Sequence, residues 1–221
     1  MEILLSAKNI SKTFQGRRVL DNIDIEINNA EIVAISGPSG AGKTTLLNIL
    51  STLDKPDESN KSSLIIDNEE IFSLGKNGLA KLRNQKIGFV FQFHELIPEL
   101  NVLENVCLPG WIKNDNDVKK KAEELLKYFG LEDFTYKKPL TLSGGEKQRV
   151  AIARSLVNNP KIIFADEPTG NLDSKNSKIL FDLFFKLRDD YNCSVVIVTH
   201  DEKSANICDR KLLIVDGKIK N

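Results

Sequence analysis

The sequence has few cysteines and no excess of charge of either sign. Its three cysteines, Cys107, Cys193 and Cys208, are far apart and form no CxxC pair, so neither a disulfide framework nor a thiolate metal site is expected. We expect reduced, structural thiols. The 31 basic and 31 acidic residues give a formal net charge of zero. This balance argues against a nucleic-acid binder that relies on bulk charge, although a local basic patch remains compatible with it.

Long apolar runs are also absent. No run approaches the roughly 20 residues that a membrane-spanning helix needs. The amino terminus, MEILLSAKN, has an acidic second residue and an apolar stretch too short for a signal peptide. Any role at a membrane is therefore expected to depend on a partner. The length of 221 residues and the hydrophobic content of 41% suit one domain with a sizeable core.

Four short apolar runs, separated by helical patterns, predict parallel strands that are buried on both faces. They span residues 31–36, 87–91, 161–165 and 194–198. The residues that follow them are, in order, GPSGAGKTT, Gln92, Asp166 with Glu167, and Thr199-His200-Asp201. Ligands of open α/β sheets bind beyond the carboxyl ends of the strands. The four runs therefore predict a single site at one edge of the sheet.

The segment GPSGAGKT, residues 37–44, fits the pattern G-x-x-x-x-G-K-[ST] between a strand and a helix at 45–50. Backbone N–H groups of such a loop converge on phosphate oxygens. Lys43 is expected to reach the β- and γ-phosphates, and the Thr44 hydroxyl is placed for Mg²⁺. A chance match is the alternative, and the strand-to-helix context argues against it. The expected nucleotide contacts are Gly37, Pro38, Ser39, Gly40, Ala41, Gly42, Lys43, Thr44 and Thr45.

Two acidic residues end the third run. Asp166 is suited to the Mg²⁺ shell, and Glu167 to orienting or deprotonating an attacking water. An acidic loop before Pro168 is the alternative, which the upstream phosphate loop disfavours. His200 by itself is an ordinary polar loop residue, but beside a phosphate site it can donate a hydrogen bond to the γ-phosphate. His94 is expected to be an ordinary loop or surface residue.

The segment LSGGEKQRVAIARSLVNNP predicts a helix that begins with a capping box and ends at 158–160. Ser143 and Glu146 have the spacing that the box requires. Between them stand Gly144 and Gly145, each of which costs a helix up to about 1 kcal/mol relative to alanine. Helix formation alone therefore leaves the two glycines unexplained.

The motifs GPSGAGKTT, Gln92, LSGGE, IIFADE, GNLD and His200 occur in an order that resembles the nucleotide-binding subunit of ABC transporters over essentially all 221 residues. LSGGE, found together with the motifs GPSGAGKTT and IIFADE, is specific for this family, because other P-loop classes lack it. The resemblance implies that Gln92 touches Mg²⁺ or the attacking water and senses a membrane partner. It makes His200 the switch histidine. It also implies a signature motif (Ser143, Gly144, Gly145 and Glu146) and a D-loop (Asn171, Leu172 and Asp173).

The resemblance further implies an α/β fold of the P-loop NTPase class. A RecA-like core with a mostly parallel sheet is expected at about 1–94 and 159–221, and an inserted helical subdomain at about 95–158, all within one ABC ATPase domain. An amino-terminal antiparallel sheet is expected at about 3–28. The run at 117–129 agrees, because it predicts an amphipathic helix within the subdomain.

Phe14 stands 29 residues before Lys43. The family places an aromatic side chain there that stacks on adenine. Tyrosine is common at this position, and phenylalanine keeps the stacking but loses the hydroxyl group. A core or edge-strand aromatic is the alternative that the residue type leaves open.

The mechanism that the resemblance implies is ATP hydrolysis by a homodimer that forms on ATP binding. Two copies would pack head to tail, each enclosing ATP and Mg²⁺ between one P-loop and the partner's signature motif. Glu167 would direct water while Lys43, Mg²⁺ and His200 stabilise the developing charge. A phosphate approaching from the other subunit would explain the two glycines, since bare N–H groups at the positive end of a helix can contact it.

The partners implied are integral membrane permease subunits, with no nucleic acid. The location implied for this chain is the cytoplasmic face of the inner (plasma) membrane.

The segment GFVFQFHELIPELNVLENVCLP resembles the lipoprotein-release, macrolide-export and cell-division ATPases, the first most closely, and so implies lipoprotein release. Cell-division, macrolide- or peptide-export ATPases are alternatives, although the macrolide exporter is fused to a membrane domain and this sequence ends at Asn221. An ABC ATPase acting on nucleic acid or ribosomes is disfavoured by the single P-loop and the zero net charge. Relatives usually carry a Ser-Gly turn after Pro56, where DESNKSSLIID has no glycine.

Overall fold

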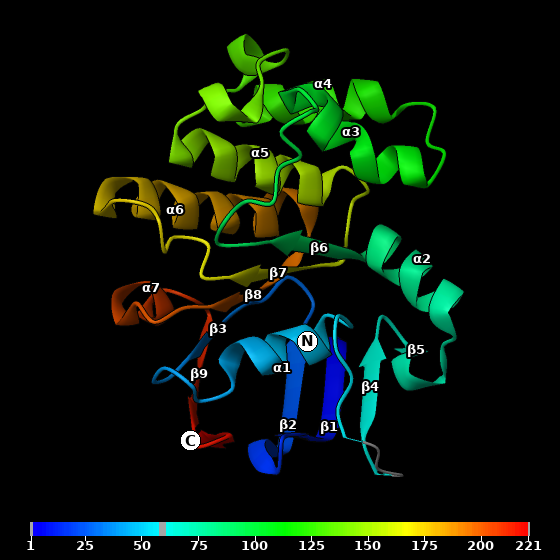
Figure 1. Cartoon of the computed structure of the whole chain (residues 1–221), viewed down its shortest axis with the longest axis vertical. Helices are drawn as coiled ribbons and strands as arrows, with labels where there is room; N and C mark the ends of the chain where they lie inside the picture. Colours follow the sequence, from blue (N-terminus) through cyan, green and yellow to red (C-terminus); the bar gives the residue numbers. More distant parts are fainter. Residues whose placement is uncertain (1, 58–60, 221) are drawn as a thin grey trace.

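The computed structural model describes residues 2–57 and 61–220 of the chain (Figure 1). Residues 58–60, in the glycine-free segment after Pro56, lie outside the described residues. The described chain forms two sheets and a set of helices that lie in successive layers from one end of the molecule to the other (Figure 1). The α/β class expected for a P-loop NTPase is confirmed.

The larger sheet has six strands in the order β10-β9-β3-β8-β7-β6. The neighbouring pairs from β9 to β6 are parallel, and only the β9–β10 pair is antiparallel. The bounds are β3 (Ile32–Ser36), β6 (Ile87–Val90), β7 (Ile162–Asp166), β8 (Ser194–Val198), β9 (Arg210–Val215) and β10 (Lys218–Lys220). The four predicted runs are thus four adjacent strands, and every residue of β3 and β8 is buried. This two-sided burial explains why the runs are continuously apolar.

The smaller sheet is antiparallel, in the order β2-β1-β4-β5. Its bounds are β1 (Ile3–Phe14), β2 (Arg17–Asn28), β4 (Ser63–Ile66) and β5 (Glu69–Glu70). The expected amino-terminal antiparallel sheet is confirmed, with β4 and β5 added from a later part of the chain. A short helix, η1 (Ile71–Ser73), and then α2 (Lys76–Lys86) connect this sheet to β6.

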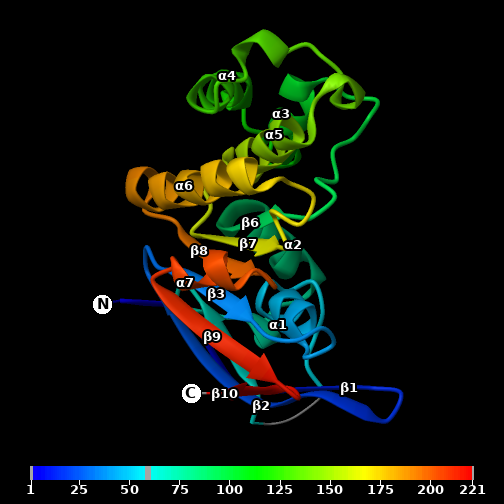
Figure 2. The same cartoon turned by 90° about the vertical axis from the view of Figure 1, so that its left-hand side faces the viewer.

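Helix α1 (Lys43–Leu50) lies between the two sheets (Figure 2). Its side chains Leu46, Leu47, Ile49 and Leu50 are buried in one hydrophobic core with residues of β1, β2 and the larger sheet. This packing fixes the start of α1, and with it the loop that precedes the helix.

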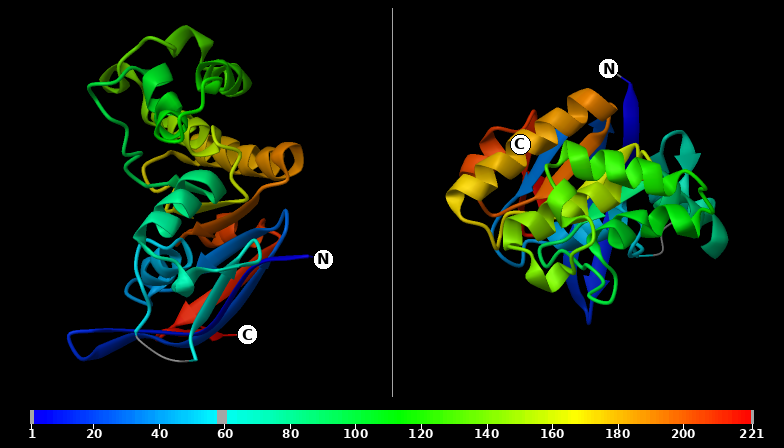
Figure 3. Two further views of the ribbon diagram at one scale, coloured as in Figure 1. Left: turned by 90° about the vertical axis from the view of Figure 1, so that its right-hand side faces the viewer. Right: turned by 90° about the horizontal axis from the view of Figure 1, so that it is seen from above.

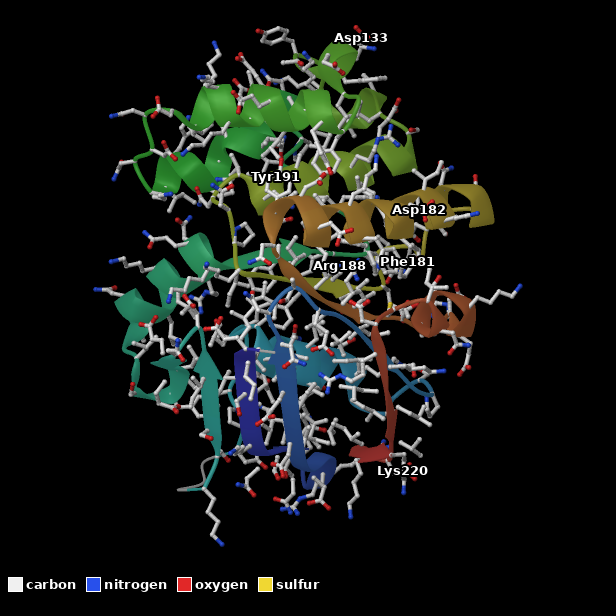
Figure 4. The ribbon with its side chains drawn as sticks, turned by 180° about the vertical axis from the view of Figure 1, so that it is seen from behind. Asp133, Phe181, Asp182, Arg188, Tyr191 and Lys220 are labelled. Atoms are coloured by element: carbon white, nitrogen blue, oxygen red, sulfur yellow. The ribbon has the colours of Figure 1, made fainter. Side chains whose placement is uncertain are left out.

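A second hydrophobic core covers the other face of the larger sheet. Helix α6 (Ser174–Tyr191), which carries the labelled Phe181, lies against that face (Figure 4). The side chains of Phe181 and Phe184 are buried in this core. Above α6 lie α5 (Gly144–Leu156), α3 (Val102–Ile112) and α4 (Val118–Tyr128), at the end of the molecule far from the β1–β2 hairpin (Figure 3). The remaining short helices are η2 (Glu132–Phe134), η3 (Pro139–Thr141) and α7 (Glu202–Asn206).

The predicted amphipathic helix is present as α4. Its buried residues Val118, Ala122, Leu125 and Leu126 recur at helical spacing and belong to the second core. Within the part of the chain that the structure describes, no helix has the length and apolar character needed to cross a bilayer.

Candidate nucleotide-binding site

The loop between β3 and α1 contains three glycines with positive φ: Gly37 (145°), Gly40 (76°) and Gly42 (100°). Only glycine adopts such angles readily. A Cβ atom at Gly37 would lie 2.1 Å from the Ile214 carbonyl oxygen, and one at Gly42 would lie 2.8 Å from the Val19 carbonyl oxygen. A Cβ atom at Gly40 would meet nothing within 4 Å. Neighbouring strands therefore require glycine at two positions, whereas Gly40 faces open space that a phosphate can enter.

Lys43 lies at the start of α1 and is buried. Its Nζ donates hydrogen bonds to the carbonyl oxygens of Gly37, at 2.9 Å, and Pro38, at 3.0 Å. The ammonium group is therefore held within the loop. No side chain caps α1, since its N-cap residue is Gly42. The first N–H groups of the helix and the positive end of its dipole are thus free of a side-chain cap and suited to bind an anion.

A cavity of about 440 Å³ joins this loop to the β1–β2 hairpin. Its lining residues are Phe14, Arg17, Val19, Ser39, Gly40, Gly42, Lys43, Thr44, Thr45 and Glu167. We call it the P-loop cavity. Gly37, Pro38 and Ala41 belong to the loop but not to this lining. A larger cavity of about 660 Å³ lies beside α2 and contains none of the predicted site residues, so volume alone does not identify the site.

Phe14 reaches the P-loop cavity because the hairpin turn is tight. Gln15 and Gly16 connect β1 to β2, and both have positive φ, 49° and 79°, as in a type I′ turn. This turn pairs Phe14 with Arg17 at the tip of the hairpin. Phe14 is 47% exposed, which excludes the core alternative. The Lys12 Nζ lies 5.2 Å from the centroid of its ring.

Arg17 also lines the cavity and was not predicted from the sequence. The signal was present, because two strands joined by a two-residue turn containing glycine place the flanking residues opposite each other. The same turn that positions Phe14 therefore positions a guanidinium group next to it.

Asp166 and Thr44 meet at the carboxyl end of β7, where the Thr44 hydroxyl donates to Asp166 Oδ1 at 3.2 Å. Burial raises the pKa of Asp166, although the Thr44 hydrogen bond opposes the shift. A cation would favour the ionised carboxylate, and hydroxyl and carboxylate oxygens are ligands that Mg²⁺ takes. Among the described residues no group of three or more His, Cys, Asp or Glu gathers as a metal site. Mg²⁺ fits this pair because it is commonly held by one or two protein groups together with phosphates.

Glu167 and His200 form a pair at the ends of β7 and β8. His200 Nδ1 lies 2.8 Å from Glu167 Oε2, and the His200 backbone N–H donates to the same oxygen at 3.4 Å. Glu167 has φ 45°, an uncommon angle for a non-glycine residue, and its N–H donates to the Val198 carbonyl. The Glu167 side chain is mostly buried, whereas the imidazole is mostly exposed. Strain of this kind is concentrated at functional sites.

Gln92 lies beside the D-loop. Its backbone carbonyl accepts a hydrogen bond from Asn171 Nδ2 at 3.1 Å, and a Cβ atom at Gly170 would lie 2.8 Å from its Nε2. Within the described residues, no hydrogen bond joins the Gln92 side chain to Thr44 or Asp166. The structure therefore does not bring this predicted Mg²⁺ ligand into contact with the other two.

His94 was expected to be an ordinary loop or surface residue, and that expectation is only partly right. The residue lies in the loop after β6, but it is half-buried, and its carbonyl oxygen accepts a hydrogen bond from Arg154 Nη2 at 2.7 Å. Burial, followed by the charge of Lys147, lowers the pKa of His94. The sequence carried no signal for this contact, because it joins residues 60 positions apart.

The signature motif opens a second cavity, of about 340 Å³. We call it the signature cavity; it is lined by Ser143, Gly144, Gly145, Glu146, Arg149, Asn171, Leu172, Asp173 and Asn176. The predicted capping box is confirmed: Ser143 Oγ accepts from the Glu146 N–H, and Glu146 Oε2 accepts from the Ser143 N–H at 2.7 Å. Hydrogen bonds from Ser143 lower the pKa of Glu146.

The two signature glycines are not required by contacts within the chain. A Cβ atom at Gly144 would lie 3.8 Å from Leu172 Cδ2, and one at Gly145 would lie 3.6 Å from Asn176 Oδ1, which are ordinary contact distances. Neither glycine has positive φ. The signature cavity and the P-loop cavity share no lining residue. Within one chain, the two sets of motifs are therefore separate.

Comparisons with known proteins agree on one family. The model of the ABC transporter family matches residues 20–170. The chain is 49% identical to the lipoprotein-releasing system ATP-binding protein LolD of Bacteroides thetaiotaomicron, over 98% of this chain and 99% of that protein. It is 46% identical to the protein of the same name from Aquifex aeolicus, over 99% of this chain and 97% of that protein.

Solved structures give the same answer. The dimeric post-hydrolysis structure of the ATP-binding cassette MJ0796, bound to ADP and Pi, matches with a TM-score of 0.87 and 43% identity over 98% of this chain and 97% of that one. A further dimeric structure of MJ0796, described as a bacterial ABC transporter cassette, has a TM-score of 0.88, 44% identity and the same coverage. The chain belongs to the ABC transporter family, as an ATP-binding cassette with ATPase activity.

Proposed function

We propose that this ATPase works as a head-to-tail dimer that powers the release of lipoproteins from the inner membrane. The observation that carries the proposal is the separation of the two cavities. The P-loop cavity holds the phosphate loop and Glu167, whereas the signature cavity presents two glycines that nothing in the chain requires. A second copy, turned so that its signature motif faces the P-loop cavity, supplies what each copy lacks. The MJ0796 cassettes are dimeric by their titles.

The proposal treats the chain as a single ATPase domain. Its core would comprise about 1–94 and 159–221, and its helical subdomain about 95–158. The nucleotide would then lie at the edge of the core, and the signature motif would belong to the subdomain. The layered arrangement of the helices supports this division (Figure 3).

Thr44 and Asp166 would hold Mg²⁺. Gln92 would be a further ligand, but its side chain, which now lies next to Gly170, would first have to turn toward the ion. When bound, Mg²⁺ supplies positive charge next to the β- and γ-phosphates. Lys43 would exchange its bonds to the loop carbonyls for bonds to the same phosphates. Its charge would then stabilise the charge that develops on the γ-phosphate.

Glu167 would orient the attacking water and accept its proton. The bond from His200 Nδ1 to Glu167 Oε2 fixes the imidazole relative to the carboxylate. To donate from its other ring nitrogen to the γ-phosphate at the same time, the imidazole would have to be protonated, since only then do both ring nitrogens carry a hydrogen. Phe14 would stack on adenine at the other end of the cavity, and Arg17 would contact the ribose or phosphates.

The membrane part of the proposal draws on the relatives. Proteins named as lipoprotein-releasing system ATP-binding subunits match this chain over almost its whole length. No described helix is long and apolar enough to cross a bilayer. We therefore propose integral membrane subunits as the partners and the cytoplasmic face of the inner membrane as the location.

The test is purification of the chain with its membrane partners, followed by reconstitution in proteoliposomes loaded with a lipoprotein. We expect ATP-dependent release of the lipoprotein into the aqueous phase, and no release with a Glu167→Gln chain. Copurification with cell-division proteins, or ATP hydrolysis that releases no lipoprotein, would contradict the proposed cargo. A Glu167→Gln complex that still releases lipoprotein would contradict the role of Glu167.

A further inference from the structure

The side chain of Arg154 binds the backbone of the loop that follows β6. Arg154 lies in the last turn of α5. Its Nη2 donates to the His94 carbonyl oxygen at 2.7 Å, and its Nη1 donates to the Glu95 carbonyl oxygen. His94 and Glu95 have φ of 65° and 48°, angles that non-glycine residues seldom adopt. One guanidinium group therefore satisfies the carbonyl groups of two consecutive left-handed residues.

Arg154 is partly buried, and no carboxylate of the described residues forms an ion pair with it. By contrast, Arg18, Arg188 and Arg210 each pair with at least one carboxylate. Burial lowers the pKa of Arg154, and the charge of Glu95 only partly opposes the shift. Burying a charge costs free energy unless strong hydrogen bonds compensate for it. The bonds to the two carbonyl groups are therefore what compensates for burying this guanidinium group.

The loop that Arg154 binds also carries Gln92. The His94 N–H donates to the Phe91 carbonyl oxygen at 3.1 Å, which closes a β-turn with Gln92 at its second position. The Gln92 carbonyl accepts from Asn171 Nδ2 at 3.1 Å. The backbone of Gln92 is thus held directly by the D-loop and, through His94, by Arg154.

This loop is separate from the phosphate loop. Within the described chain, neither Arg154 nor any residue from 91 to 95 lines the P-loop cavity. The Gln92 side chain lies next to Gly170, so the position of its backbone decides whether the amide oxygen can turn and reach Mg²⁺. A change at Arg154 can therefore move Gln92 while the P-loop cavity keeps its shape.

We propose that Arg154 is a positioning residue, which holds the turn at 91–95 so that Gln92 can reach the Mg²⁺ ion. The inference rests on the proposed function, because Gln92 is a Mg²⁺ ligand only under that proposal. Without the guanidinium group, the two left-handed residues relax toward more favourable φ angles, and the turn moves. Nucleotide then still binds to the P-loop cavity, while the response to Mg²⁺ and the rate of hydrolysis are impaired.

The experiment compares a full-length Arg154→Met chain with the unchanged chain. Methionine keeps an unbranched side chain and has no hydrogen-bond donor. Arg188→Met is the matched control, since Arg188 also lies in the last turn of a long helix, α6, but pairs with Asp189 and Asp209. Three quantities are measured: the affinity for a fluorescent ATP analogue in EDTA, kcat for ATP, and the Mg²⁺ concentration that gives half-maximal hydrolysis.

For Arg154→Met we expect an unchanged affinity in EDTA, a kcat about tenfold lower and a half-maximal Mg²⁺ concentration about tenfold higher, the size of one lost hydrogen bond to a charged group. Arg154→Lys, which keeps the charge but loses the planar fork, should show a smaller loss of the same kind. Arg188→Met should melt at a lower temperature than the unchanged chain and should keep its Mg²⁺ dependence.

Two second substitutions identify the residues through which Arg154 acts. Glu95→Gly removes the strain of a left-handed non-glycine residue, and the Glu95 side chain is exposed. Added to Arg154→Met, it should restore most of both losses. In a Gln92→Ala background, Arg154→Met should raise the half-maximal Mg²⁺ concentration no further, because the effects of residues that act through one another are not additive.

Several results would overturn the inference. An Arg154→Met chain with the kcat and Mg²⁺ dependence of the unchanged chain would show that the guanidinium group positions nothing. An equal effect of Arg154→Met with and without Gln92→Ala would mean that it acts elsewhere on α5. Failure of Glu95→Gly to restore either loss would show that the turn does not depend on Arg154, and an equal change of Mg²⁺ dependence in Arg188→Met would trace the effect to stability.

Failure of the proposed function would look different. Gln92→Ala alone would then keep the Mg²⁺ dependence of the unchanged chain, which would remove the ligand role of Gln92 and this inference with it.

Discussion

The glycines of the P-loop and those of the signature motif are present for different reasons. At Gly37 and Gly42 an added Cβ would strike the backbone of another strand, and both φ angles are positive. At Gly144 and Gly145 an added Cβ would make only ordinary contacts. The first pair is required by the fold of the single chain. The second pair is compatible with the fold but not required by it.

The difference supports the proposal that the start of α5 contacts a second copy of the chain. A helix start that carries glycines without a steric reason has bare N–H groups at its positive end, and these suit a phosphate. The P-loop cavity is lined by most of the phosphate loop, by Glu167 and by the aromatic side chain of Phe14. The signature cavity is lined by the first turns of α5, the D-loop and Asn176, and none of its lining residues belongs to the phosphate loop. This contrast can be sharpened or broken by the substitutions below.

The largest effect is expected for Glu167→Gln, which keeps the shape of the P-loop cavity and removes its base. Hydrolysis should fall about a thousandfold, within the range for loss of a general base. ATP should still bind and should trap a dimer, detectable by size-exclusion chromatography. Glu202→Gln is the matched control, since Glu202 is exposed and paired with Lys211 outside both cavities. Hydrolysis at the wild-type rate in Glu167→Gln would contradict the role of Glu167 as the general base.

Gly144→Asp tests the other cavity. The carboxylate would repel a phosphate from the partner, so cooperative hydrolysis should fall at least about a hundredfold, as for loss of a preorganised donor. Monomer stability and ATP binding to the monomer should be unchanged. Gly75→Asp is a control at another helix start, because Gly75 is the N-cap of α2 and a Cβ there meets nothing within 4 Å. A Gly144→Asp chain that hydrolyses ATP normally would break the comparison.

The variants Gly37→Ala and Gly144→Ala compare the two regions through the free energy of unfolding. Gly37→Ala combines a strained φ with a clash against the Ile214 carbonyl and should lower the free energy of unfolding by about 3 kcal/mol. Gly144→Ala should leave it unchanged or raise it by up to about 1 kcal/mol, since alanine favours helices. Urea denaturation measures both. Equal losses at the two positions would show that the signature glycine is also a folding requirement.

The smallest effect is expected at the hairpin tip. Phe14→Ala should weaken ATP binding about tenfold, as for loss of one stacked base, and should leave stability unchanged because the side chain is half exposed. Phe14→Tyr should keep the affinity. Titration with a fluorescent nucleotide measures both variants. If Phe14→Ala bound ATP as tightly as the unchanged chain, the adenine would have to lie elsewhere.

Strand positions were predictable because burial on both faces produces continuous apolar runs. The predicted runs at 31–36 and 194–198 became β3 and β8 within one residue. By contrast, β9 and β10 were not predicted. In RKLLIV only Ile214 is buried, so the strand lacks the continuous burial that marks the central strands. Its place in the sheet depends on pairing with β3, which is distant in sequence.

Site residues were predictable where a local pattern carries the chemistry. The P-loop can be recognised from eight consecutive residues, and the capping box of Ser143 and Glu146 from four. Arg17 was not predicted, although the two-residue turn that positions it, Gln15-Gly16, could be recognised in the sequence. The contact of Arg154 with the His94 carbonyl oxygen could not be found from sequence, because it depends on how the loop after β6 packs against α5.

The sequence by itself determined the chemistry: a phosphate loop, an acidic pair, a histidine and a capped helix start with two glycines. These are local patterns, set by backbone geometry and side-chain type over a few residues. Only the tertiary structure decided which glycines the fold needs, that Glu167 pairs with His200, and that the signature motif opens a cavity apart from the P-loop. The physical reason is that strand order and helix packing bring residues such as Gly37 and Ile214 together across long stretches of chain, and local patterns do not encode those distances.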